Sequence, residues 1–303
     1  MALMNTSASS TRPSSSSAPA LAVAAVAVTI VSWASAFPFI RIGLQGLSPL
    51  HLAAGRFATA ALLAAAWLVY RRPRPPSPRD ALRFAACGFF GIGIYNALLN
   101  TGEMTVAAGA ASFIVNTLPL FTALLATFFL GERFNRWGWL GSIFSFAGIG
   151  VIASGQPGGL VPGAGASLIL SAALCSAVFF VIQRRLIPVY GPLACAAYTL
   201  LAGALWLAPW LPGALGELSN ASAGTMRAVV ILGVFPAAIG YATWAYARGY
   251  FGAARAANFL YLTPAVATAM SIVLTGEQLR LSTVIGGLMV IAGVAYVAWR
   301  GRR

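Results

Sequence analysis

The amino-acid sequence predicts an all-α integral membrane protein, in which ten transmembrane helices form two inverted five-helix repeats. Three observations lead to this prediction: an apolar composition, ten long apolar runs, and an internal repeat that divides these runs into two sets of five. Of the 303 residues, 59% are hydrophobic and only 8% are charged, whereas soluble domains have about 25% charged residues. This composition excludes a soluble enzyme, a disordered chain and a disulfide-rich scaffold.

The charged and metal-binding residue types point away from other functions. All 19 basic residues are arginine, and the net charge is +14. Because the arginines stand between apolar runs and not on one face, we expect no nucleic-acid partner. Cys87, Cys175 and Cys195 lie inside apolar runs without metal-ligand spacing, and His51 is the single histidine. We therefore expect neither a bound metal nor a cofactor.

The apolar runs follow one another along the chain between Pro, Gly and Arg residues, and each has about the 20 residues needed to span a bilayer. The tail 1–19, rich in Ser, Ala and Pro, is predicted to be disordered. The ten runs then cover residues 20–44, 50–70, 81–102, 105–130, 135–154, 165–187, 193–211, 226–248, 253–275 and 280–299. The first run also allows a signal-peptide interpretation, with cleavage near Ala34-Ser35-Ala36, but it continues to Leu44 and is long enough to span.

The arginines predict the orientation in the membrane. If the N-terminus is inside, fifteen of the nineteen arginines lie in cytoplasmic segments. Arg41, Arg227 and Arg280 lie at outer ends, and Arg56 lies within the second run. Positively charged loops face the cytoplasm, so we expect both termini inside, in a multi-pass protein of the bacterial inner membrane.

The second half of the chain repeats the first. Residues 107–155 align with 252–300 without a gap at an offset of 145, which pairs Pro119 with Pro264 and Gly131-Glu132 with Gly276-Glu277. A looser match at an offset of 143 joins 37–54 to 180–197. The predicted units are therefore a repeat at 20–155, a linker at 156–164, a repeat at 165–300 and a basic tail at 301–303.

An odd number of helices in each repeat places the second repeat upside down in the membrane. Glu132 is then cytoplasmic and Glu277 external. Inverted repeats are typical of secondary transporters, because two similar halves provide two states open to opposite sides. The alternative is a duplicated scaffold that does not transport.

Several motifs resemble one protein family. They are Trp33 to Phe39, Ser48-Pro49-Leu50 with Arg56-Phe57, the run from Ala107 to Glu132, and the run from Tyr241 to Glu277. With them the chain resembles the drug/metabolite transporter superfamily, in particular its ten-helix proteins built from two EamA-type domains, and among these the bacterial amino-acid exporters of the YddG kind. The resemblance covers nearly the whole chain after residue 20. It implies a transporter that exports small metabolites, amino acids above all.

Polar and aromatic residues recur at helical spacing on five of the predicted helices. In hydrocarbon, amides and phenols need hydrogen-bond partners and face the bundle interior, so we expect a central cavity. The alternative is that they join helices as packing contacts. An aromatic, uncharged cavity suits a substrate with an apolar or aromatic side chain, whose amino and carboxylate groups amides and hydroxyls could hold. The candidate substrate-binding residues are Trp33, Phe37, Tyr95, Asn96, Asn100, Ser112, Asn116, Tyr241, Trp244, Asn258 and Tyr261.

Two prolines and one buried charge complete the candidate residues. Pro119 and Pro264 lie near the middle of their predicted helices, so we expect kinks that act as hinges or, alternatively, only widen the cavity. Arg56 must be paired inside the membrane, and Glu103 is the expected structural partner; the alternative is an anion-attracting role at the outer mouth. Glycines in the fifth and tenth runs favour close helix packing.

The acidic residues predict how transport is driven. All five lie at helix ends or in loops, at Asp80, Glu103, Glu132, Glu217 and Glu277. Proton coupling usually needs a titratable group on the pathway, so we expect facilitated transport by alternating access, with a proton-coupled drug/metabolite antiporter as the alternative. No nucleotide-binding loop or nucleophile–base cluster is present, so an enzyme is less favoured. The expected partners are a small-molecule substrate and the lipid bilayer, and we expect a monomer, with a homodimer as the alternative.

Overall fold

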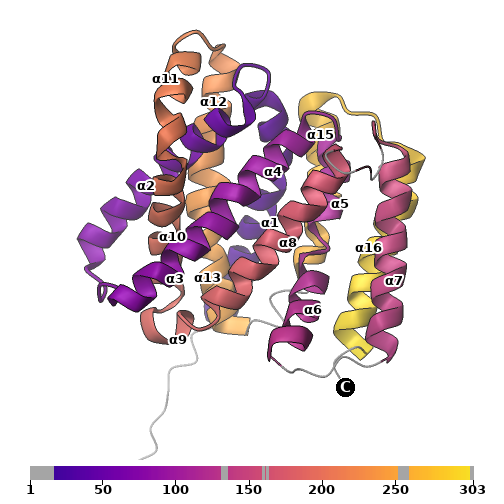
Figure 1. Cartoon of the computed structure of the whole chain (residues 1–303), viewed down its shortest axis with the longest axis horizontal. Helices are drawn as coiled ribbons and strands as arrows, with labels where there is room; N and C mark the ends of the chain where they lie inside the picture. Colours follow the sequence, from indigo (N-terminus) through magenta and orange to yellow (C-terminus); the bar gives the residue numbers. More distant parts are fainter. Residues whose placement is uncertain (1–16, 131–135, 159–160, 162–163, 252–258, 301–303) are drawn as a thin grey trace, which may run out of the picture.

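The computed structural model describes residues 17–130, 136–158, 161, 164–251 and 259–300, and these residues form a helical bundle without a strand (Figure 1). The elements before the linker are α1 (Ser17–Gly43), α2 (Pro49–Arg71), α3 (Pro78–Gly88), the π-helical turn η1 (Phe89–Gly93), α4 (Ile94–Glu103), α5 (Ala108–Val115), α6 (Leu118–Leu130) and α7 (Arg136–Ser154). Those after it are α8 (Gly165–Gln183), α9 (Ile187–Tyr190), α10 (Pro192–Leu207), η2 (Ala208–Trp210), α11 (Leu211–Ser219), α12 (Ala223–Leu232), the π-helical η3 (Gly233–Ile239), α13 (Gly240–Phe251), η4 (Leu260–Leu262), α15 (Thr263–Thr275) and α16 (Leu281–Arg300).

Ten apolar segments of the described chain correspond to the ten predicted runs. Eight are long and apolar enough to cross a membrane, and two shorter ones cover Leu260–Thr275 and Leu281–Val297. The all-α, multi-pass prediction is therefore confirmed. Helix α1 begins at Ser17, three residues before the first predicted run, and residues 1–16 of the predicted tail lie outside the described residues. Residues 212–219, between the seventh and eighth predicted runs, are helical, because Pro209 and Pro212 each stand in the first turn of a new helical segment, where proline is tolerated.

The two candidate hinge prolines do not lie in helix interiors. Helix α5 ends at Val115, and Pro119 is the second residue of α6. Pro264 is likewise the second residue of α15. In place of the predicted mid-helix kinks, a two-residue turn separates α5 from α6 before Pro119, and the 3-10 turn η4 leads into α15 before Pro264; both prolines stand in a first helical turn, where proline is tolerated. Between α5 and α6 Thr117 donates from its hydroxyl to Ile114 O at 2.7 Å and from its backbone N to the same oxygen at 3.1 Å, so this carbonyl near the end of α5 is satisfied.

The third and eighth apolar segments share a π-helical turn. Each begins with a serine N-cap, Ser77 or Ser222, whose hydroxyl accepts the backbone N–H three residues later. These two serines are 145 residues apart, the same offset as in the sequence repeat. Each segment then passes through η1 or η3, and π-helical turns of this kind are frequent at functional sites. The fold therefore repeats its irregular features as well as its helices.

Helices α7 and α16 pack side by side, apart from the other helices in the view of Figure 1. Their glycines make this approach possible: a Cβ on Gly148 would stand 2.7 Å from Gly286 O, and one on Gly293 would stand 2.6 Å from Gly141 O. Since Gly141 and Gly286, and Gly148 and Gly293, are equivalent in the repeat, the crossing is symmetric. The predicted role of these glycines in close helix packing is confirmed.

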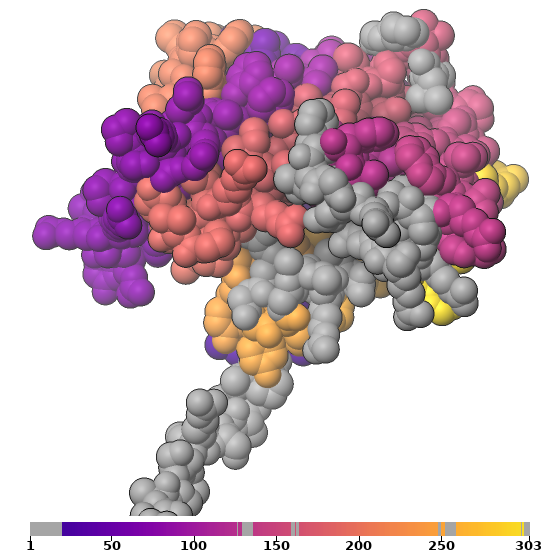
Figure 2. Space-filling model, turned by 60° about the horizontal axis from the view of Figure 1, so that its bottom comes forward, coloured from indigo at the N-terminus to yellow at the C-terminus, as the bar shows by residue number. Residues whose placement is uncertain are grey.

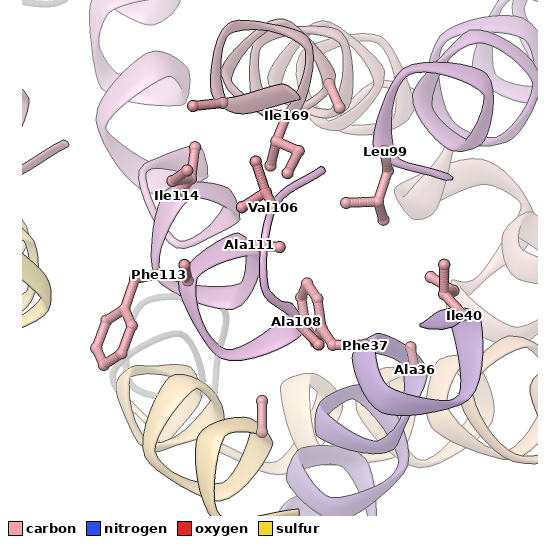
Figure 3. Close-up of a cluster of buried hydrophobic side chains, with 14 of the residues drawn as sticks. Ala36, Phe37, Ile40, Leu99, Val106, Ala108, Ala111, Phe113, Ile114 and Ile169 are labelled. Atoms are coloured by element: carbon pink, nitrogen blue, oxygen red, sulfur yellow. The ribbon is translucent and has the colours of Figure 1, made fainter. Parts of the chain in front are cut away.

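The main apolar core surrounds α5. Figure 3 shows its small residues Ala108 and Ala111 beside Phe37 of α1, with Ile169 of α8 on the other side. The first five residues of α5 are Ala, Gly or Ser, so neighbouring helices approach closely there. This packing holds α1, α5 and α8 around the centre of the bundle.

Candidate functional site

A cavity of about 150 Å³ lies at the centre of the bundle, between the two sequence repeats. Its walls come from α1, α2, η1, α4, the break between α5 and α6, α8, α10, η3, α13 and the start of α15. The residues lining it are Trp33, Ala36, Phe37, Arg56, Gly91, Tyr95, Leu99, Val115, Leu118, Ser176, Phe179, Phe180, Gln183, Pro192, Ala196, Pro236, Tyr241, Trp244, Ala245, Leu260 and Thr263.

Equivalent positions of the two repeats line this cavity. At the offset of 143 residues, Trp33, Ala36 and Phe37 of α1 pair with Ser176, Phe179 and Phe180 of α8. At the offset of 145, both helix breaks contribute, with Val115 and Leu118 opposite Leu260 and Thr263. At an offset of 146, Tyr95 and Leu99 pair with Tyr241 and Ala245. The cavity therefore lies where the two halves meet.

One wall is an aromatic cluster of Trp33, Tyr241 and Trp244. The ring centroids of Trp33 and Tyr241 are 5.8 Å apart with an edge-to-face geometry, and those of Trp33 and Trp244 are 5.4 Å apart. Trp33 also donates its indole N–H to Pro236 O at 3.1 Å, in η3. This bond holds the Trp33 ring in place, so the wall presents rigid apolar faces to the cavity.

Five of the eleven candidate substrate-binding residues line the cavity: Trp33, Phe37, Tyr95, Tyr241 and Trp244. The polar candidates do not, because they bond to the protein itself. Asn96 donates to Ile92 O at 2.8 Å, Asn100 to Pro49 O at 2.9 Å, Ser112 to Gly109 O at 2.6 Å and Asn116 to Ser112 O at 3.2 Å. Tyr261 packs against the main apolar core, and Asn258 lies outside the described residues.

Arg56 and Glu103 do not form the predicted ion pair. Arg56 lines the cavity and donates from Nη1 to Asn96 Oδ1 at 3.1 Å. Glu103 lies seven residues beyond Asn96 on α4, a rise of about 10 Å, so the Arg56 side chain meets Asn96 first. Both carboxylate oxygens of Glu103 are buried without a hydrogen-bond partner among the described residues.

Several cavity residues were not predicted from the sequence. Ser176 and Phe180 could have been, because they are the repeat equivalents of Trp33 and Phe37 at the offset of 143. Gln183 and Thr263 carry no such signal in the sequence alone. Among the described residues, no group of three or more His, Cys, Asp or Glu side chains could hold a metal ion.

A polar layer of Arg41, Gln156 and Glu277 lies at the N-terminal end of α5, and we call it the Glu277 layer. Glu277 accepts the backbone N–H groups of Ala108 at 2.9 Å and Gly109 at 3.3 Å, so it caps the N-terminus of α5. Arg41 Nε stands 3.6 Å from Glu277 Oε1, and Gln156 accepts from Ala107 N at 3.2 Å. The last residue of α5, Val115, lines the cavity about 12 Å along this helix from its capped end, and Phe37, one turn before Arg41 on α1, lines it as well.

The opposite end of the bundle lies nearer to the cavity. Gln183, the last residue of α8, and Pro192, the first residue of α10, both line it. Figure 2 turns this end forward, and segments of the first half in purple and of the second half in coral and orange form it together. The cavity is therefore displaced from the Glu277 layer toward the end that contains the α8–α10 connection.

Comparisons with known proteins agree with this architecture. The model of the EamA-like transporter family matches the chain twice, over residues 5–154 and 163–299. A solved crystal structure matches with a TM-score of 0.59 and 21% identity, over 96% of this chain and 100% of its own. At that identity the likeness shows the fold alone.

Related proteins are named as transporters. An uncharacterized transporter, YdfC of Bacillus subtilis, is 38% identical over 87% of this chain and 86% of its own. A probable terminal-alkyne amino-acid exporter of Streptantibioticus cattleyicolor is 37% identical over 93% of this chain and 95% of its own. YedA, an uncharacterized inner membrane transporter of Escherichia coli, is 31% identical over 82% of this chain and 81% of its own. The chain therefore belongs to the EamA-like transporter family, in the drug/metabolite transporter superfamily, and is a multi-pass membrane transporter.

Proposed function

We propose that this protein exports amino acids and similar small metabolites by alternating access, and that the central cavity is the substrate site. The observation that supports this most is the lining of the cavity by repeat-equivalent residues of both halves. In an inverted repeat, a site at the interface can be reached from either side when the halves rock against each other. A scaffold without transport would not need a cavity at this place.

The chemistry of the cavity favours a substrate with an apolar or aromatic side chain. A cavity of about 150 Å³ with apolar walls accommodates a ring the size of benzene, and the rings of Trp33, Tyr241 and Trp244 offer stacking faces. One relative is named as a probable amino-acid exporter, which supports amino acids as the substrate class. Tyr95, Tyr241 and Ser176 supply hydroxyl groups for the polar end of such a molecule.

The distribution of arginines supports a bacterial inner membrane protein with both termini in the cytoplasm. In that orientation the Glu277 layer is external, and the end with Gln183 and Pro192 faces the cytoplasm. The described conformation then has its cavity nearer the cytoplasm, where an exporter takes up its substrate. Two repeat units, 20–155 and 165–300, would move relative to each other.

Facilitated transport is the mode of coupling that the cavity favours. Among the described residues that line it, none is Asp, Glu or His, so a proton carrier is absent from this part of the pathway. A substrate gradient alone would then drive export. The proton-coupled antiporter remains the alternative, because Glu103 is a buried acid without a partner.

Transport by purified protein in proteoliposomes tests this proposal. We expect uptake of phenylalanine or leucine down a substrate gradient, at a rate that is the same with and without a pH gradient. Competition by other apolar amino acids and none by sugars would support the substrate class. Uptake of none of the twenty amino acids would refute the proposed function, and strict dependence on a pH gradient would establish the antiporter in its place.

A further inference from the structure

Arg56 is a buried cation in the wall of the cavity that forms no ion pair with another described residue. Its exposed fraction is 6%, and in the part of the chain that the structure describes it makes no ion pair within 4.0 Å and one side-chain hydrogen bond, to the neutral amide of Asn96. Its Nε–H is buried without a partner. Burying a charge is costly unless an opposite charge or full hydrogen bonding compensates it.

The repeat shows that the fold does not need an arginine here. At the offset of 143 residues, the equivalent of Arg56 in α10 is Thr199. The register is supported by the burial pattern: Ala60 and Ala64 of α2 are buried, and so are their equivalents Gly203 and Leu207 of α10. A small, uncharged residue therefore supports the same helix packing. The charge of Arg56 must serve a purpose that α10 does not share.

The surroundings of Arg56 hold the guanidinium ready for a ligand. Asn96 fixes Nη1, and Asn96 is itself held by its bond to Ile92 O. The guanidinium carbon lies 4.9 Å from the ring centroid of Phe57. Nη1 is the one guanidinium nitrogen with a hydrogen bond to a described residue, so other N–H groups of the planar fork remain for an anion, which arginine can bind through two parallel hydrogen bonds.

No charged or titratable group among the described residues forms an ion pair with Arg56. Tyr95 and Tyr241 line the same cavity. Glu103 of α4 interacts with Arg56 electrostatically but makes no hydrogen bond to it, and Arg41 and Glu277 are bound to each other in the Glu277 layer. The aromatic wall of Trp33, Tyr241 and Trp244 lines the same cavity. Arg56 therefore offers a site for a negative group whose apolar remainder meets that wall.

We infer that Arg56 binds the carboxylate of the transported molecule, so that a carboxylate beside an apolar or aromatic side chain is the feature this protein recognises. This inference rests on the proposed function, because it uses the same cavity. Arg56 is then a specificity-determining residue, and Asn96 a positioning residue that orients it. Molecules with the same side chain but no carboxylate should be poor substrates.

A panel of phenylalanine analogues on the wild-type protein tests the inference without any mutation. In proteoliposomes, phenylalanine should compete for transport about 10- to 100-fold better than phenylalaninol or phenethylamine, the range expected for charge-assisted hydrogen bonds. Equal competition by phenylalanine and phenylalaninol would overturn the inference. If 3-phenylpropionate is transported and no amino acid is, the carboxylate site stands and the proposed amino-acid substrate fails.

Variants of Arg56 then test whether this residue is responsible for the preference for the carboxylate. Arg56→Gln should reduce the preference for phenylalanine over phenylalaninol to about one, and Arg56→Lys should keep part of it. Thr199→Val, a nearly isosteric change at the equivalent position of the other repeat, should leave the preference unchanged. Melting temperatures of the purified variants report folding. A folded Arg56→Gln that keeps the wild-type preference would contradict the assignment, and if that variant does not fold, Arg56→Lys and the wild-type panel decide.

Discussion

Removing the Glu277 carboxylate should open the Glu277 layer. Its contribution can be estimated from its contacts: the cap on two N–H groups of α5 is worth about 1 kcal/mol, and its charge at the helix N-terminus about 0.3–1 kcal/mol. The ion pair with Arg41, whose side chain is 35% exposed, adds about 0.2–1 kcal/mol. Together these contacts favour the closed layer by about 2 kcal/mol. If the layer separates in the other state, Glu277→Ala should raise the open-to-closed ratio about 30-fold.

A cysteine at Thr268 can report this opening. Thr268 of α15 contacts Gly109 of α5 beneath the layer, so a thiol there should react with a membrane-impermeant reagent only when the layer opens. In a background without the native cysteines, Glu277→Ala should accelerate its modification about 30-fold. Gln278→Ala, at the exposed neighbouring residue, is the matched control. Equal modification rates in the two variants would refute the view that Glu277 keeps this end closed.

Three further outcomes follow from the fold and the site. Trp244→Ala should weaken transport of aromatic amino acids more than that of alanine, and unchanged relative rates would remove Trp244 from the site. Gly148→Ala should lower the melting temperature, because its Cβ would stand 2.7 Å from Gly286 O, whereas Gly150→Ala, with open space around it, should not; equal melting temperatures would argue against the α7–α16 packing. A cysteine at Asn220 should react from outside the cell and one at Pro75 should not, and the reverse pattern would invert the proposed orientation.

The ten apolar segments and their pairing into repeats could be predicted because they depend on local sequence. Each segment has to satisfy its backbone within hydrocarbon, so length and composition suffice to find it. Helix boundaries next to prolines were harder to predict from the sequence. Pro119 and Pro264 were expected inside helices, but a proline can also begin a helix, and the choice depends on whether residues such as Thr117 can satisfy the preceding helix end.

The residues of the cavity could be predicted only in part. Aromatic residues such as Trp33 and Trp244 were correctly expected to line a cavity, because large rings inside a helical bundle pack against one another, and here they form one wall of the cavity. The amides of Asn96, Asn100 and Asn116 are not among the residues that line this cavity, and each donates to a nearby carbonyl. Which partner a buried polar group meets is a property of helix rotation and tertiary distance, and helical spacing alone does not determine it.

Substrate protection of a single cysteine tests most directly whether the central cavity is the transport pathway. Ser176 lines the cavity, as does its repeat equivalent Trp33, and serine to cysteine is a small change. In a cysteine-free background, a small thiol reagent should modify Ser176→Cys and block transport, and phenylalanine should slow the modification in proportion to its occupancy of the site. Complete modification that leaves transport intact, or modification that substrate does not slow, would contradict the cavity as the pathway.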